Sequence, residues 1–245
     1  NANEFLQTNG SGVLSFAAVA DELPSQSGNT GLFLTTNGSA PSWAAAGGGL
    51  QSVQYITSSG TWTKPSGITK IIVHVQAPGG AGGAATGSNQ VSAAGGGGAY
   101  CRKFIDVTSI SSETVTVGSA GVPVSSSSGT AGGTTSFGSH CTATGGAGGT
   151  QSYNYKASGG TATGGDLNIN GGSGEVANLS FPSASYTYWT AGAGGQAFMG
   201  ISSGSATTTS YRDGQGYGAG GSGAKNATGG GGAGAGSIVI VEEYA

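Results

Sequence analysis

The residues of this chain that could do chemistry are few and widely spaced. Seven Lys and Arg residues and ten Asp and Glu residues are distributed over 245 positions. Hydrolysis of a glycosidic bond needs two carboxyl groups that flank the bond, and Asp166 with Asp213 is an example of a pair that the fold could assemble. We interpret these carboxylates as solvated loop residues. A Ser-His-Asp triad is not indicated either, because His74 lies inside an expected strand and no Ser occupies a nucleophile elbow. The sequence therefore predicts that the protein is not an enzyme.

The sequence also predicts no cofactor and no metal. Residues 216–221 match the pattern G-x-G-x-x-G, but 53 glycines make such a match nearly unavoidable, and no apolar strand leads into it. The spacing of His74, His140, Cys101 and Cys141 fits no zinc-ligand pattern. We interpret the two cysteines as small buried or half-buried thiols. A disulfide between them is an open alternative.

Aromatic residues between glycine blocks are the candidates for binding. Tyr and Trp give a large, rigid contact area at low entropic cost, and Ser, Gly and Asn supply adaptable hydrogen bonds. Residues 151–156, 181–189 and 198–212 have this composition. Loops on a rigid scaffold commonly carry function, although such rings can also cap the ends of glycine layers. The binding candidates are Tyr153, Tyr155, Tyr186, Tyr188, Trp189, Phe198, Tyr211 and Arg212.

Glycine blocks flank these aromatic residues and must position them. Ordering glycine costs more backbone entropy than ordering any other residue. An ordered glycine block must therefore offset this cost through something that the lack of side chains allows. Aromatic islands between the blocks argue against a disordered linker. Extended polyproline-II-type helices have three residues per turn and hydrogen-bond only to neighbouring helices. We therefore predict packed polyglycine-II-like helices, with loops wrapped over a sheet as the alternative. The blocks include residues 79–83, 95–98, 145–149, 159–165, 192–195 and 229–236.

β-strand patterns bracket the glycine-rich region. Residues 68–77 are rich in β-branched side chains, and residues 237–244 have the same character. These strands are expected to share one sheet or a small sandwich; residues 14–23 are the only weak helix candidate. The predicted fold is all-β: a small β-sandwich with a glycine-rich insertion, preceded by β-hairpin shaft repeats. The frame is predicted at 50–78, 98–118 and 236–245, and the glycine-rich insertions at 79–97 and 119–235.

Residues 1–46 contain a repeat. Phe5 and Phe33 open two similar copies about 28 residues apart, and each copy has an Asn-Gly turn, a strong hairpin signal. Two hairpins cannot bury a core alone, so we expect identical chains to intertwine there. A joint of small residues at 44–49 predicts domains 1–46 and 47–245. The first residues are neither an initiator nor a signal peptide, so we expect a piece of a longer protein.

The composition excludes several partners. Charged residues make up 7% of the chain and the formal net charge is -3, whereas about 25% charged residues is typical. So few Lys and Arg residues provide no basic patch that could bind nucleic acid and no basic stretch that could bind a membrane surface. Apolar runs stay well below the ~20 residues of a membrane span. We therefore predict no nucleic-acid partner and no membrane insertion.

Several motifs together resemble the glycine-rich C-terminal domains of phage tail fibre proteins. The resemblance covers about residues 50–245, and its residues are 59–68, 73–75, 79–83, 97–100, 114–118, 135–138 and 234–241. Residues 23–28 and 33–38 resemble shaft repeats of marine, particularly cyanobacterial, phage fibres. The glycine blocks are also similar in composition to the tip adhesins of T-even-type phages, where glycine helices form a layered sandwich and variable loops contact the host.

The resemblance implies a function. It implies a homotrimeric fibre, extracellular and part of a virion, that binds a host outer-membrane protein or surface polysaccharide. The favoured hypothesis is a non-catalytic adhesin at the distal tip, which contacts its receptor through loops between glycine blocks. Two alternatives stay open: a structural, self-assembling glycine-rich surface fibre, and a polysaccharide-cleaving tip that uses Asp166 and Asp213.

Overall fold

Every regular element in the described part of the chain is a β-strand, so the all-β prediction is confirmed. The computed structural model describes residues 4–8, 10–18, 24–36, 38–44, 48–87, 90–152, 154–183, 186–206, 211–226 and 229–245. The weak helix candidate is wrong, because residues 14–18 form a strand and the rest of it lies outside the described residues. The chain divides into two compact units, Asn1–Gly49 and Leu50–Ala245, near the predicted boundary.

The first unit contains the two predicted hairpins. Its strands are β1 (Glu4–Thr8) paired with β2 (Leu14–Ala18), and β3 (Phe33–Thr36) paired with β4 (Pro41–Ala44), both antiparallel. Gly10 and Gly38 have φ angles of 79° and 91°, a left-handed conformation that glycine adopts without strain. Apolar side chains such as Leu14 and Phe33 are 65% and 62% exposed. The described apolar side chains of the hairpins therefore form no buried core in a single chain.

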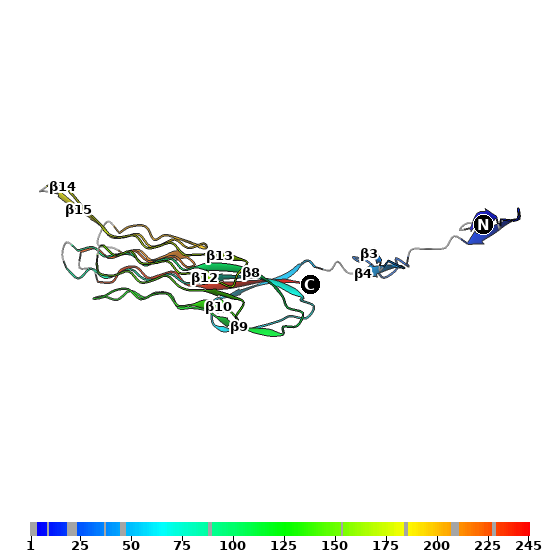
Figure 1. Ribbon diagram of the computed structural model, residues 1–245, viewed down its shortest axis with the longest axis horizontal. Coiled ribbons are helices and arrows are strands. Elements are labelled where there is room, and N and C mark those ends of the chain that lie inside the picture. Colours follow the sequence, from blue (N-terminus) through cyan, green and yellow to red (C-terminus); the bar gives the residue numbers. More distant parts are fainter. Residues whose placement is uncertain are drawn as a thin grey trace. The chain divides into compact units, whose positions relative to one another are not determined.

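A β-sandwich of two five-stranded antiparallel sheets forms one end of the second unit (Figure 1). The first sheet has the order β12-β11-β10-β9-β6 and the second β13-β8-β7-β18-β5. β18 pairs with β7 along its whole length, as expected for the strands that bracket the glycine-rich region. The strands are β5 (Leu50–Ile56), β6 (Gly60–Thr63), β7 (Lys70–Gln76), β8 (Tyr100–Asp106), β9 (Ser112–Thr116), β10 (Thr135–Phe137), β11 (Cys141–Ala143), β12 (Ala162–Thr163), β13 (Leu167–Ile169) and β18 (Ile238–Tyr244).

The core lies between the two sheets. The rings of Trp62 and Phe137 pack with centroids 5.6 Å apart, and apolar side chains of β7 and β18 are fully buried beside them. Cys101 of β8 and Cys141 of β11 are buried and form a disulfide that joins the sheets, with their Cα atoms 6.3 Å apart. The interpretation of the cysteines as free thiols is therefore wrong.

Glu243 is a carboxylate buried at the edge of this core. Its side chain accepts hydrogen bonds from Trp62 Nε1 at 2.8 Å, from Gln54 Nε2 at 2.7 Å and from Ser52 Oγ. A buried carboxylate is costly unless hydrogen bonds satisfy its oxygens, and here three neutral donors do so. These bonds connect β5, β6 and β18.

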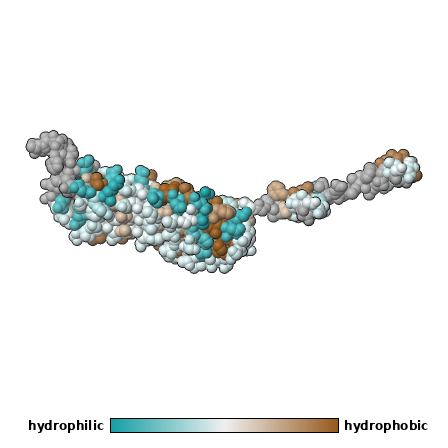
Figure 2. Space-filling view, in the orientation of Figure 1, coloured by the Kyte–Doolittle hydropathy of each residue, from teal (hydrophilic) through white to brown (hydrophobic). Residues whose placement is uncertain are grey.

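The outer face of the second sheet carries exposed apolar side chains. Val53, Phe104 and Leu167 are 36%, 51% and 45% exposed. Antiparallel pairing places Val53 opposite Glu242, which shares its face with His74. Figure 2 shows apolar surface over this strand-rich end of the unit.

Glycine-rich segments run side by side away from the sandwich (Figure 1). Their backbone hydrogen bonds repeat every three residues, so that every third N–H group of segment 77–85 donates to the same neighbour. The donor–acceptor pairs are Gly79–Ala235, Gly82–Gly232 and Ala85–Gly229 with one neighbour, Gly80–Gly96 and Gly83–Ala93 with a second, and Ala81–Thr130 and Ala84–Ser127 with a third.

Two central segments, 77–85 and 92–99, each hydrogen-bond to six neighbouring segments, three through their N–H groups and three through their carbonyls. A period of three with partners on all sides is the pattern that packed polyglycine-II-like helices require; the helix geometry itself stays a prediction. Only small residues fill these segments, and they are buried. A Cβ atom on Gly80 or Gly96 would lie far inside contact distance of a neighbouring carbonyl oxygen.

Candidate functional site

The glycine-rich segments alternate in direction, so their connections gather at two ends of the second unit. One end adjoins the sandwich, and we call the opposite end the loop end. The hairpin of β14 (Asn178–Ser183) and β15 (Tyr186–Thr190) projects at the loop end (Figure 1). The short strands β16 (Gly200–Ile201) and β17 (Gln215–Gly216) pair near the sandwich. Described residues of the loop end are 86–87, 90, 124–127, 150–152, 154–157, 177–183, 186–191, 205–206, 211–212, 224–226 and 229–230.

The loop end contains most of the predicted binding residues. Tyr155 and Tyr211 are 42% and 51% exposed there, and Arg212 is exposed as well. Three further candidates lie on β15, and of these three only the backbone is described: Tyr186, Tyr188 and Trp189. Tyr153 lies outside the described residues.

Phe198 lies at the other end of the unit. Its ring stacks on Tyr100 of β8 with centroids 4.2 Å apart, and the neighbouring Met199 N–H donates to Gln76 Oε1 at 3.1 Å. Phe198 is 57% exposed but does not share a surface with the other candidates.

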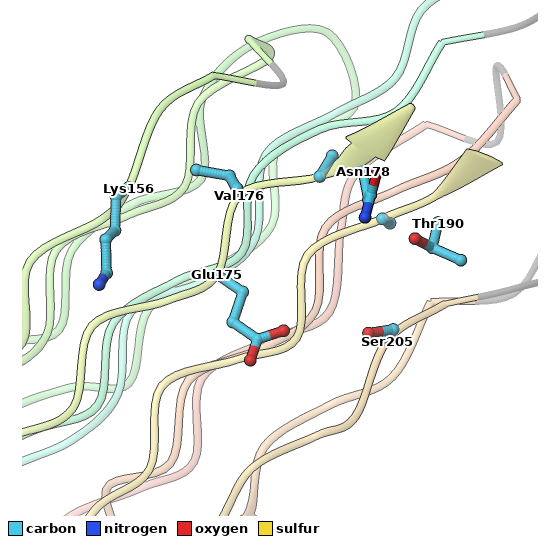
Figure 3. Close-up of a pocket in the computed structure, with 8 residues that line it drawn as sticks. Lys156, Glu175, Val176, Asn178, Thr190 and Ser205 are labelled. Atoms are coloured by element: carbon cyan, nitrogen blue, oxygen red, sulfur yellow. The ribbon is translucent and has the colours of Figure 1, made fainter. Parts of the chain in front are cut away.

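A polar pocket opens at the loop end, with a volume of about 620 Å³. Its lining residues adjoin hydrogen bonds between neighbouring segments: Gly174 N–H donates to the Ala157 carbonyl, and Ala191 N–H donates to the Ala206 carbonyl. Beyond these bonds, β14 and β15 pair with each other. We call this the loop-end pocket; it is lined by Lys156, Glu175, Val176, Ala177, Asn178, Thr190, Ala191 and Ser205 (Figure 3).

Five of the eight described residues that line the loop-end pocket have polar side chains. Lys156 stands on one side, Ser205 and Thr190 stand on the other, and Glu175 lies between them (Figure 3). Lys156 and Glu175 are exposed. Within the described part of the chain, neither side chain makes a hydrogen bond or an ion pair, and the same holds for the side chains of Asn178, Thr190 and Ser205.

The lining of the pocket was not predicted from the sequence, because it comes from four different segments. One signal was available. Charged residues are rare in this chain; Glu175 directly follows a glycine block, and Lys156 lies three residues before one.

A second, smaller pocket of about 170 Å³ also lies at the loop end. Tyr211 is its one aromatic residue among those described, and its other lining residues are Pro123, Ser125, Gly230 and Gly231. Tyr211 is thus a predicted candidate that lines this smaller pocket.

The two carboxylates considered for catalysis make separate structural contacts. Asp166 accepts a hydrogen bond from Phe104 N–H at 2.8 Å and lies 3.4 Å from Lys103 Nζ. The Phe104 hydrogen bond is the main cause that lowers the pKa of Asp166, with Lys103 adding to it, whereas a catalytic acid needs a raised pKa. Asp213 accepts from Ala233 N–H at 2.7 Å.

Titratable side chains also meet on the outer sheet face. His74 Nδ1 lies 2.8 Å from the Tyr100 hydroxyl, and His74 Nε2 lies 3.3 Å from Glu242 Oε1 without hydrogen-bond geometry. Burial lowers the pKa of His74 and outweighs the opposing effect of Glu242. In the described residues no group of three His, Cys, Asp or Glu side chains could hold a metal ion, and no helix is long and apolar enough to cross a membrane.

Comparison with protein-family models matches residues 51–243 to a family described as a glycine-rich domain. The match spans the sandwich, the glycine-rich segments and the loop-end pocket. No curated protein matches the chain.

Proposed function

The chain belongs to the glycine-rich domain family, and from this premise we propose that it is a non-catalytic adhesin, the distal tip of a phage tail fibre that binds a host cell surface. One observation carries the proposal: separate connections place exposed Tyr155, Tyr211 and Arg212 and the loop-end pocket at one end of a scaffold held by main-chain bonds. Contact residues on a rigid support lose little entropy on binding. Such a tip works outside the host cell as part of a virion.

Identical chains are the proposed partners of the shaft and of the strand-rich end. Large exposed apolar patches in soluble proteins mark interaction sites. Leu14 and Phe33 of the hairpins and Phe104 and Leu167 of the sandwich supply such surface in a single chain. We expect light scattering on the purified chain to give the mass of a homotrimer. A monomer would contradict this proposal, and long filaments would favour the structural fibre instead.

Host binding is tested with the whole purified chain. Labelled protein is added to a panel of bacterial strains, and the same protein competes with phage for adsorption. Tyr155→Ala and Tyr211→Ala are expected to weaken adhesion, whereas Phe198→Ala, an equally exposed ring at the other end, is the matched control. If the chain adheres to no strain and blocks no phage, the proposed function is wrong. If all three variants lose adhesion equally, the loop end is not the surface that contacts the host.

A further inference from the structure

We propose that the loop-end pocket binds a neutral sugar unit, which is held between Lys156 as hydrogen-bond donor and Glu175 as acceptor. This inference rests on the proposed function, because it names the chemistry that the loop end recognises. It is based on the side chains that line the pocket and on their lack of partners in the described part of the chain.

The two charged groups of the pocket suit hydroxyl groups. An ammonium group only donates hydrogen bonds and a carboxylate only accepts them, whereas a sugar hydroxyl does both. Neighbouring hydroxyls of one ring can therefore accept from Lys156 and donate to Glu175. Hydrogen bonds with one charged partner are roughly twice as strong as neutral ones.

The balance of charge favours a neutral ligand. Lys156 would attract an anionic group, but Glu175, which lines the same pocket, would repel it. A ligand with an ammonium group would be attracted by Glu175 and repelled by Lys156. A ligand without formal charge avoids both penalties and keeps both hydrogen bonds. Its affinity is also expected to depend little on salt, because screening acts mainly on pairs of formal charges.

The remaining lining fits a sugar in polarity and size. Asn178, Thr190 and Ser205 add an amide and two hydroxyl groups, and none of these side chains has a partner in the described part of the chain. The volume of about 620 Å³ lies inside the range of roughly 300–1,000 Å³ for small-ligand sites. The pocket can hold one or two rings of an extended glycan.

The same lining disfavours a protein ligand. Binding sites for proteins concentrate their energy in buried aromatic or large apolar anchors. Among the described residues, the buried apolar lining consists of Ala177 and Ala191, and Val176 is 45% exposed. A peptide side chain would gain little from this described lining, so hydroxyl-rich ligands are favoured.

The test uses immobilised disaccharides of three classes: neutral hexose, uronic-acid-containing and glucosamine-containing. We expect the whole chain to bind a neutral disaccharide, with affinity that changes less than about twofold between low and high salt. Lys156→Met and Glu175→Gln should each weaken binding about tenfold or more, because each leaves ligand hydroxyls without a charged partner. Lys70→Met, an exposed lysine on β7, is the matched control and should bind normally.

The outcomes separate this inference from the proposed function. Binding restricted to uronic-acid or glucosamine probes, or affinity that falls steeply with salt, overturns the neutral-sugar assignment. If adhesion to cells persists but no disaccharide binds, and both pocket variants adhere normally, the pocket is not the recognition site and the adhesin proposal survives. Absence of any adhesion by the unaltered protein overturns the proposed function itself. Ser205→Ala, the smallest change in the pocket, should weaken sugar binding without affecting thermal stability.

Discussion

Gly96→Ala tests whether the missing side chains of the scaffold are required for its packing. Gly96 lies in segment 92–99, and an added Cβ would overlap the carbonyl oxygen of Ser158, a backbone atom that cannot rotate away. Replacing Gly by Ala at an unhindered position usually stabilises by about 0.4–1 kcal/mol through the unfolded chain. Overpacking a tight interior costs about 1–3 kcal/mol or more. Since the segment bonds to six neighbours, it cannot shift without disturbing them, so we expect a cost at or above the upper end of that range and, after the gain is subtracted, a net loss of roughly 2–3 kcal/mol.

Scanning calorimetry of the whole chain measures this loss. For a unit of this size, roughly 2–3 kcal/mol corresponds to a fall in Tm of about 4–12 °C. Gly236→Ala is the control, because its Cβ would meet no atom within 4 Å and its φ is not positive; its Tm should stay unchanged or rise slightly. If Gly96→Ala and Gly236→Ala melt at the same temperature as the unaltered protein, the segments are not closely packed and the reasoning fails.

Three further predictions concern the sandwich. Trp62→Phe removes an indole donor from the buried Glu243 carboxylate and should lower the free energy of unfolding by about 1–3 kcal/mol in urea. Replacing Cys101 and Cys141 together by Ser removes a cross-link of sequence separation 40 and should cost about 4 kcal/mol; a Tm insensitive to reductant would contradict this. Because burial lowers the pKa of His74 below 6.5, the folded state binds fewer protons there than the unfolded state. Stability should therefore fall as the pH drops from 6.5 towards the folded pKa, and His74→Gln should flatten that part of the pH profile.

Part of the strand frame was predictable because side chains encode it, whereas β10 to β13 lie inside the segment 119–235 that was predicted as a glycine-rich insertion. Runs of β-branched residues at 68–77 and 237–244 predicted β7 and β18, and their similar character predicted that they share a sheet. Asn-Gly pairs likewise predicted both hairpins of the first unit. Each of these signals depends on side chains that prefer one conformation.

The partners of the glycine-rich segments were not predictable. Glycine has no side chain that could distinguish one neighbour from another, so the sequence indicates close packing without saying which segments meet. Phe198 illustrates the consequence. The segment around Phe198 resembles the loop-end segments in composition. Only the alternating direction of the segments places Phe198 beside Tyr100 of β8.

Contacts between distant segments were also missed, because patterns along one segment do not show which other segment lies against it. Cys101 and Cys141 belong to strands of opposite sheets, and the residue patterns of these strands do not show how β8 lies over β11. Lys156, Glu175 and Ser205 come from separate segments and meet only because those segments lie side by side. Hydrophobic periodicity contains no information about such neighbours.

The three-residue hydrogen-bond repeat also affects how such a protein can evolve. Since amide and carbonyl groups hold the segments in place, substitutions in the connections leave those bonds untouched, while most substitutions inside a central segment introduce a clash. New specificity can therefore arise by exchange of short connections, including changes in their length, without refolding the framework. Related chains are expected to vary most where two neighbouring segments are joined and least where a segment is surrounded on all sides.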